Sequence, residues 1–298
     1  MKLTLNIAIA VFIIASMPAE AAVTLTMGGR MGYIWWRPPW RDGAAMLPPT
    51  KDMPFSVSAR GRVVSLPSSG TYGVGAGIRF LESWFFSATF QYGAYRSQSN
   101  PELQFHTIKS RRNINRYDFV SDAGYWFARY AAVMLTVQAR VYDYAEKVKY
   151  ISFIPDQQFG WWSAKGESIE AGPGIGVKLR VPLYGDISLL SRLVAMILPG
   201  GASYTFDYLY RVTGAGLELG IGPFNKEGYH SFAGSFSMAV AYRIPAANII
   251  LSLGGSYEVA RYTHRRSMKG FLSYGGRLDH YGGILLAADY AAEFGTKE

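Results

Sequence analysis

The sequence predicts an all-β protein: a single transmembrane, antiparallel, up-and-down β-barrel with short periplasmic turns and long outer loops. Three observations support this class: the composition, an alternation of side chains with a period of two, and an alternation of short and long links. The chain has 298 residues with 33 Gly, 21 Tyr and 17 Phe, which favours strands and turns over helices. It has no Cys, which excludes disulfide scaffolds, thiolate nucleophiles and Cys-ligated metals.

The first 21 residues have the composition of an export signal. Lys2 gives a basic start, an apolar run extends from Ile7 to Ala15, and Ala19-Glu20-Ala21 forms an A-x-A cleavage site. The apolar run is shorter than the ~20 residues that a membrane-spanning helix needs. We therefore expect residues 1–21 to be a cleaved signal peptide and residues 22–298 to form the barrel.

Apolar and small or polar residues alternate along the rest of the chain. Between Thr71 and Phe80 the even positions are apolar, whereas the odd positions are Thr71, Gly73, Gly75, Gly77 and Arg79. After the short link Leu81-Glu82-Ser83, the same pattern continues from Trp84 to Ala94, which predicts a hairpin. Similar runs recur at 116–127, 133–141, 169–181, 187–197, 231–242, 249–259 and 281–294.

The links between these runs are alternately short and long. The long connections are about 37–69, 97–115, 146–165 and 263–280, and the links on the other side have only a few residues. This asymmetry is typical of transmembrane barrels, in which closure satisfies every strand edge in lipid. A soluble sandwich would carry many Lys and Glu on its polar faces, whereas the polar faces here are mostly Gly, Ser and Thr.

The number of strands depends on residues 202–223. If Ala202–Tyr210 and Ala215–Pro223 are two separate strands, the barrel has twelve strands and both chain ends lie on the inner side. If these segments form a hairpin that rises above the membrane, the barrel has ten strands. We favour twelve strands, with ten as the alternative.

Aromatic residues are expected to form a girdle at each membrane interface. The group near the long loops comprises Trp35, Trp36, Trp40, Tyr92, Tyr95, Tyr142, Tyr144, Trp161 and Trp162. The group near the short turns comprises Phe80, Trp84, Phe85, Tyr125, Trp126, Phe127, Tyr130 and Tyr184.

Together, the signal Ala19-Glu20-Ala21, the repeated hairpins and a last strand with Tyr290 and Phe294 resemble Gram-negative outer-membrane β-barrels over the whole chain. Residues 33–38 and 116–118 are similar to segments of uncharacterised spirochaetal surface barrels. The ten-strand alternative resembles the omptin surface proteases in layout, but it lacks their Asp-x-Asp and Asp-x-His motifs. The resemblance implies the outer membrane of a diderm bacterium, with the loops at the cell surface.

Catalytic signatures are scarce, so we do not expect an enzyme, and a surface hydrolase is only the third functional class. The chain has no G-x-S-x-G elbow, no H-E-x-x-H helix and no P-loop. The four histidines, His106, His230, His264 and His280, fall in or beside the predicted outer loops. No cofactor and no metal site are expected.

Charged residues on the inward faces are the candidate site. The alternating glycines leave room in the lumen for larger side chains from other strands. The predicted lumen-lining residues are Arg30, Arg79, Asp118, Asp122, Arg140, Glu170, Lys178, Arg180, Arg192, Glu258 and Asp289. These charges can line a narrow channel or solute passage, which is our first hypothesis. They can instead pair and close a structural or surface-binding barrel, which is the alternative.

Basic residues cluster in the predicted outer loops, where the formal net charge of +9 is concentrated. A positive surface attracts polyanions. The candidate polyanion-binding residues are Lys109, Arg111, Arg112, Arg265 and Arg266. The expected partners are outer-membrane lipid, anionic glycolipid or glycan, and the outer-membrane assembly machinery. Nucleic acid is not expected as a partner of an exported barrel.

The signal segment generates the first prediction. The mature protein should begin at Ala22, should be rich in β-structure and should fractionate with the outer membrane, because export removes residues 1–21. N-terminal sequencing and circular dichroism of the membrane fraction check this. A mature protein that still begins at Met1, or a mainly helical spectrum, would contradict it.

Overall fold

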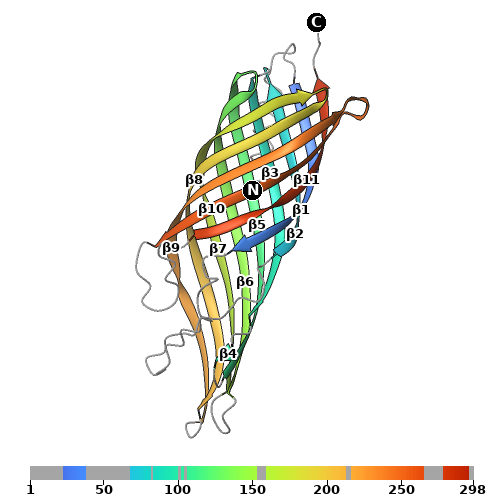
Figure 1. The fold of residues 1–298 in the computed structure, drawn as a ribbon. Coiled ribbons are helices and arrows are strands. Elements are labelled where there is room, and N and C mark those ends of the chain that lie inside the picture. Colours follow the sequence, from blue (N-terminus) through green and yellow to red (C-terminus); the bar gives the residue numbers. More distant parts are fainter. Residues whose placement is uncertain are drawn as a thin grey trace.

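The structure is a computed structural model, and it describes residues 23–37, 68–81, 83–99, 102–103, 106–152, 159–212, 216–264 and 278–294. These residues form an all-β, closed, antiparallel barrel (Figure 1). The predicted signal segment, Arg265 and Arg266 lie outside the described residues. No helix in the described part of the chain is long and apolar enough to cross a bilayer.

Ten strands make up the ring, and a two-residue strand, β4 (Glu102–Leu103), lies beside β5 outside it. The strands of the ring are β1 (Val23–Arg37), β2 (Ser68–Phe80), β3 (Trp84–Ser99), β5 (His106–Ala128), β6 (Ala131–Ser152), β7 (Phe159–Tyr184), β8 (Ile187–Val212), β9 (Gly216–Ile244), β10 (Ile249–His264) and β11 (Leu278–Phe294). A 3₁₀ turn, Pro245–Ala247, connects β9 to β10.

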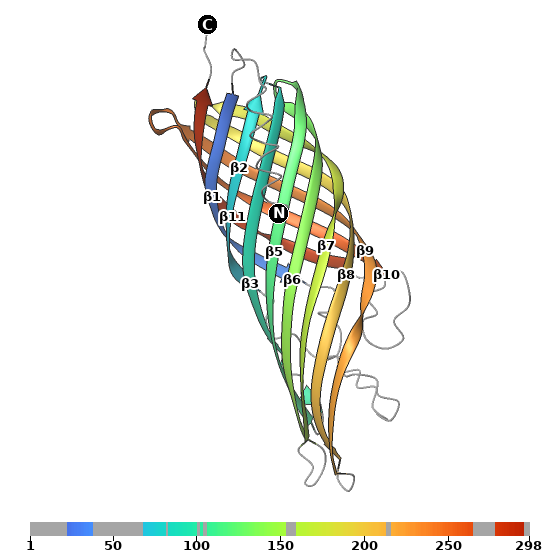
Figure 2. The same cartoon turned by 180° about the vertical axis from the view of Figure 1, so that it is seen from behind.

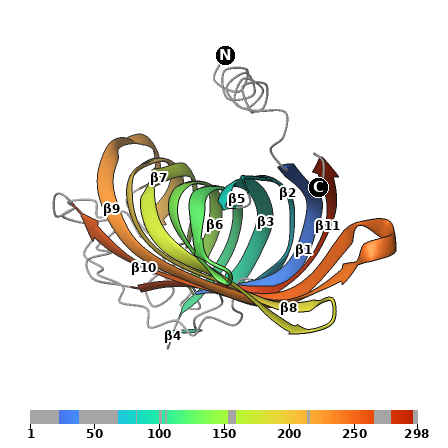
Figure 3. The same cartoon turned by 90° about the horizontal axis from the view of Figure 1, so that it is seen from above.

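The ring closes between the first and the last strand. β1 pairs with β11 from Val23 opposite Phe294 to Arg37 opposite His280, and every other strand of the ring pairs with its neighbours along the chain. Figure 3 shows β1 and β11 side by side when the barrel is seen from above. Around the closed ring each strand pairs on both sides, as a sheet in lipid requires. Past the ring, the part of β9 before Tyr229 pairs with β8 alone. The predicted fold class is confirmed.

The favoured count of twelve strands is wrong, and the ten-strand alternative is correct. The Pro199-Gly200-Gly201 segment, which separates two runs in the sequence, lies inside β8 and pairs with β9 on its other side. The β7–β8 ladder skips positions 171–173 opposite 197–199, because Pro173 and Pro199 cannot donate to it. Gly172 allows the close approach there, since a Cβ on it would lie 2.0 Å from the Ile197 carbonyl oxygen. The chain therefore continues as one long hairpin.

Two segments that we predicted as long loops are largely strand. Residues 97–115 contribute to β3 and β5, and residues 146–165 contribute to β6 and β7. Figures 1 and 2 show β5 to β9 running on together toward a tapered end of the barrel. We call this the long-strand end, and we call the opposite end, where the turns around 81–83, 129–130, 185–186 and 245–248 lie, the short-turn end.

A belt of exposed apolar side chains surrounds the barrel. On β6 it includes Val133, Leu135 and Val137, which are 49–66% exposed. The outward apolar run on this strand extends from Ala131 to Val141 and ends at Asp143, which agrees with the ~9–11 residues that a transmembrane strand needs. The belt therefore covers the short-turn part of β5 to β9, and these strands continue past it.

Exposed aromatic residues lie near the short turns, and Trp35 is exposed toward the other edge of the belt. Trp40 lies outside the described residues. Trp84, Tyr125, Phe127, Tyr130 and Tyr184 are exposed near the short turns, as predicted for a girdle. Among the girdle residues whose side chains the structure describes, Phe85, Tyr95, Trp126 and Tyr142 share the parity of lumen-facing positions instead. Phe85, Tyr95 and Tyr142 are buried, and Trp126 packs against Phe85. Strand parity, and not distance from a turn, decides which side of the wall an aromatic residue occupies.

Candidate functional site

Five charged side chains meet in the lumen and form what we call the central ion network: Arg116, Asp118, Arg140, Glu170 and Glu258. Arg140 of β6 lies at its centre. Its Nε is 3.3 Å from Asp118 Oδ1, its Nη1 donates to Glu170 Oε1 at 3.0 Å, and its Nη2 contacts Glu258 Oε2. Arg140 therefore joins three carboxylates from three strands.

Arg116 of β5 is the second cation of the network. Its Nε and Nη2 donate to the two carboxylate oxygens of Asp118 at 2.6 and 3.0 Å. Its Nη2 also lies 3.8 Å from Glu258 Oε1. Such bidentate, charge-assisted contacts fix the orientation of both partners.

The network crosses the lumen. Asp118, Arg140 and Glu170 come from the adjacent strands β5, β6 and β7, whereas Glu258 comes from β10 on the other side of the ring. The five side chains are at most 9% exposed. Ser231 of β9 donates to Glu170 Oε2 at 2.9 Å, which satisfies a further buried oxygen. At this level, side chains from the described strands fill the lumen.

A layer of three tyrosines and two isoleucines, which we call the aromatic layer, covers the network on its long-strand side. It comprises Ile34, Tyr95, Ile114, Tyr142 and Tyr281, all buried. The hydroxyls of Tyr95 and Tyr281 are 3.2 Å apart, and the Arg116 guanidinium lies 3.5 Å from the centre of the Tyr281 ring. This cation–π contact stabilises the arginine in a place with little water.

A second ion pair lies on the short-turn side of the network. Arg192 of β8 donates to both oxygens of Asp122 at 3.0 and 2.8 Å, and Thr136 donates to Asp122 Oδ1 at 2.8 Å. Buried apolar side chains, among them Met134 and Met196, lie nearby on the same strands. The pairing offsets the cost of removing these charges from water.

On the short-turn side of the central ion network the lumen is hollow. A cavity of ≈ 590 Å³ occupies its short-turn half, with Arg116, Asp118, Glu258 and Tyr281 among its lining residues at the closed end. The lumen thus has a filled part near the long-strand end and a hollow part near the short turns.

The eleven lumen residues proposed from the sequence separate into these two parts. Asp118, Arg140, Glu170 and Glu258 lie in the central ion network, and Asp122 and Arg192 form the second pair. Arg30, Arg79, Lys178, Arg180 and Asp289 line the cavity. Sequence reasoning missed Arg116, Tyr281 and Ser231 as site residues, although Arg116 shares the inward parity of Asp118 and Asp122.

The proposed polyanion-binding residues are only partly described. Lys109, Arg111 and Arg112 belong to β5 and not to a loop, which corrects their predicted location. Arg111 is exposed and lies directly opposite Lys147 of β6, which is also exposed. The ladder extends across segments predicted as loops, so Arg111 and Lys147 are displayed on the wall of the barrel.

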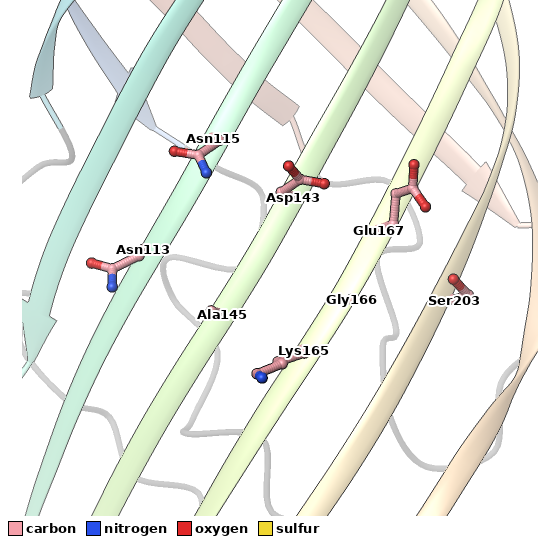
Figure 4. Close-up of a pocket in the computed structure, with 8 residues that line it drawn as sticks. All are labelled: Asn113, Asn115, Asp143, Ala145, Lys165, Gly166, Glu167 and Ser203. Carbon is pink, nitrogen blue, oxygen red and sulfur yellow. The ribbon is translucent and has the colours of Figure 1, made fainter.

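A polar row follows the apolar belt on the outside of the wall. Asn115, Asp143, Glu167 and Ser203 are successive ladder partners on β5 to β8, and they line a shallow pocket of ≈ 370 Å³ with Asn113 and Lys165 (Figure 4). The Tyr92 hydroxyl donates to Asn115 Oδ1 at 3.3 Å, which connects this row to the aromatic edge of the belt. The row marks where the wall changes from apolar to polar.

The four histidines lie in strands, and three of them lie at or near a strand end in or beside a segment predicted as an outer loop. His106 begins β5, His264 ends β10, and His230 and His280 lie within β9 and β11. His280 Nδ1 is 2.5 Å from the Tyr257 hydroxyl, on the outer face of the wall. In the part of the chain that the structure describes, no group of three His, Asp or Glu side chains could hold a metal ion.

Comparisons with known proteins find outer-membrane barrels. The outer-membrane protease OmpT from Escherichia coli is 10% identical, with 93% of this chain and 98% of that chain covered and a TM-score of 0.43. The translocator domain of the autotransporter NalP from Neisseria meningitidis is 10% identical, with coverage of 97% and 95% and a TM-score of 0.41. A FadL homologue from Pseudomonas aeruginosa is 9% identical, with coverage of 91% and 90% and a TM-score of 0.24. No family model and no curated protein matches the chain.

The central ion network generates a stability prediction. Replacing Arg140 with Met should lower the free energy of unfolding by about 3–5 kcal/mol, because it leaves buried carboxylates without their cation. Replacing the lumen-exposed Arg180 with Met is the matched control and should change it by less than about 0.5 kcal/mol. Urea unfolding of both variants in detergent micelles measures the difference. Equal stabilities would show that the network does not hold the barrel together.

Proposed function

We propose that this protein is an outer-membrane β-barrel that is closed to ions and binds anionic molecules at the cell surface. In this proposal the short-turn end faces the periplasm and the long-strand end faces outward, as is usual for bacterial barrels. The observation that supports closure is the central ion network, in which buried side chains from opposite walls meet in the lumen. This places the closed, surface-binding barrel ahead of the channel hypothesis.

A channel would require the lumen to open at the level of the central ion network. Opening would separate Arg140 from Glu258 and expose the aromatic layer of Tyr95 and Tyr281. Separating a buried ion pair is costly unless water or new partners replace every contact. The hollow short-turn half alone does not connect the two ends of the barrel.

The long-strand wall supports surface binding. Beyond the apolar belt, most of the outward side chains that the structure describes are polar or charged, and Arg111 and Lys147 are cross-strand neighbours of the same sign. Such a pair destabilises a bare sheet, whereas an anion bound between the two side chains would stabilise it. Headgroups of anionic glycolipids and acidic glycans are the partners with suitable chemistry at that surface.

The remaining partners follow from the same architecture. The apolar belt contacts outer-membrane lipid, and the assembly machinery inserts the closed barrel. We propose no nucleic-acid partner, no cofactor and no catalytic step for this barrel.

Closure has a direct electrical test. Purified protein in planar lipid bilayers should give no single-channel current steps, because the central ion network fills the lumen. The double variant Arg140→Ser/Glu258→Ser should give such steps, since it removes the contact that crosses the lumen. Arg180→Glu, which leaves the network intact, should stay silent. Regular current steps in the unmodified protein would overturn closure and support the channel hypothesis.

Surface binding is tested with heparin as an acidic glycan. The folded protein should bind heparin with an affinity that falls steeply between low and physiological salt. Changing Arg111 and Lys147 to Ser should weaken binding about tenfold or more, and adding Lys109→Ser, Arg112→Ser, Arg265→Ser and Arg266→Ser should abolish it. Arg129→Ser, a change in an exposed turn at the other end, is the matched control. Salt-independent binding, or equal binding by the sixfold variant, would refute the proposal.

A further inference from the structure

The hollow short-turn half of the lumen has a charge distribution that closure of the barrel does not require. Below the central ion network, six cationic side chains and four carboxylates line the cavity. The cations are Arg30, Arg79, Lys178, Arg180, Arg192 and Arg243, and the carboxylates are Asp122, Asp186, Asp289 and Glu293. Two ion pairs, Arg192 with Asp122 and Arg243 with Glu293, use part of this set. The lining keeps an excess of positive charge.

Three of these arginines lie at the mouth of the cavity. The backbone N–H of Arg180 donates to the carbonyl of Tyr130 in the β5–β6 turn at 3.0 Å, and that of Arg243 donates to Asp186 in the β7–β8 turn at 3.0 Å. Arg79 comes from β2, one residue before that strand ends, and its guanidinium lies 5.9 Å from the Trp126 ring. The mouth is therefore surrounded by guanidinium groups from β2, β7 and β9.

These arginines are close enough to repel one another. Arg180 lies within electrostatic range of both Arg79 and Arg243. A space whose lining has more cations than carboxylates, with apolar walls such as Phe85, focuses the electric field and concentrates anions. An anion bound there would reduce this repulsion.

The geometry selects among anions. Guanidinium groups form paired, directional hydrogen bonds with phosphate and carboxylate oxygens. Donors that come from three strands around a mouth surround a tetrahedral phosphate better than a planar carboxylate. Hydroxyls of Thr24, Ser188 and Ser237 also line the cavity and can donate to the remaining oxygens. The volume of ≈ 590 Å³ is within the range of ~300–1,000 Å³ for small-molecule sites.

We propose that the short-turn half of the lumen is a binding site for a phosphate-bearing anion that enters between Arg79 and Arg180. The site is blind, because the central ion network forms its closed end. With the short turns in the periplasm, the ligand comes from that compartment or from the lipid leaflet next to it. Binding at the mouth does not depend on whether the barrel conducts ions, so this proposal and the proposed closure are tested separately.

Titration calorimetry of the full-length folded barrel in a non-ionic detergent tests the site. The two probes are pyrophosphate, as a free anion, and dihexanoyl phosphatidic acid, as a soluble lipid with a phosphate headgroup. At least one probe should bind saturably with a stoichiometry near one, and its affinity should fall as salt rises. Binding of pyrophosphate assigns the site to soluble anions, and binding of phosphatidic acid alone assigns it to lipid headgroups.

The matched variants locate the binding. Arg79→Gln/Arg180→Gln should weaken binding at least tenfold, whereas Arg129→Gln should leave it unchanged, because Arg129 is exposed and stacks on Tyr130 outside the cavity. Heat-modifiable migration on gels confirms that each variant is folded. The change in tryptophan fluorescence on binding should be reduced in Trp126→Phe, because Trp126 lies beside Arg79. Absence of saturable binding by both probes, or equal affinity in the double variant, would overturn the proposal.

Discussion

Arg140 is the residue on which the interior of this barrel depends. Its side chain is fully buried, and its contacts reach Asp118, Glu170 and Glu258 on three different strands. A lone guanidinium in such a place would be strongly unfavourable, so the carboxylates and their strands must be held at fixed distances. The hydrogen-bonded ladder of the closed sheet holds the strands at these distances. The ionic contacts in turn connect opposite walls of the barrel. Backbone closure and lumen filling are therefore coupled.

The two halves of the lumen differ because the sizes of the inward side chains differ. Near the network, long charged side chains and tyrosines from β3, β5, β6 and β11 reach across the space. Toward the short turns, β2, β9 and β10 present small residues such as Gly75, Gly77, Ser235 and Ser252, which leave room around the remaining arginines. The same wall can therefore be closed to passage and still hold a pocket that opens at one end.

Much of the architecture could be predicted from local pattern. The alternation of residues gave the β class, and the parity of each strand placed the eleven charged residues on faces that point inward. The contact between Arg140 and Glu258 could not be predicted, because it joins strands on opposite sides of the ring and depends on the register of every ladder between them. The strand number could not be decided either, because Pro199-Gly200-Gly201 is typical of a link, yet its ladder gap is absorbed inside β8. The segments 97–115 and 146–165 lack apolar alternation, so nothing local distinguished polar strands from loops.

That absence of alternation has a physical cause which also bears on function. Within the belt, lipid requires apolar residues on the outward positions, whereas past Val141 the outward positions of β6 contact water and can carry Asp143 and Lys147. The backbone ladder nevertheless continues, because each strand from β5 to β9 has a long neighbour to pair with. The result is a rigid, water-facing sheet surface that rises from the belt edge. A rigid surface loses little conformational entropy on binding, so charged pairs such as Arg111 and Lys147 can hold an anion at lower cost than flexible loops would. In the function that we propose, the long strands therefore make part of the barrel wall itself the binding surface.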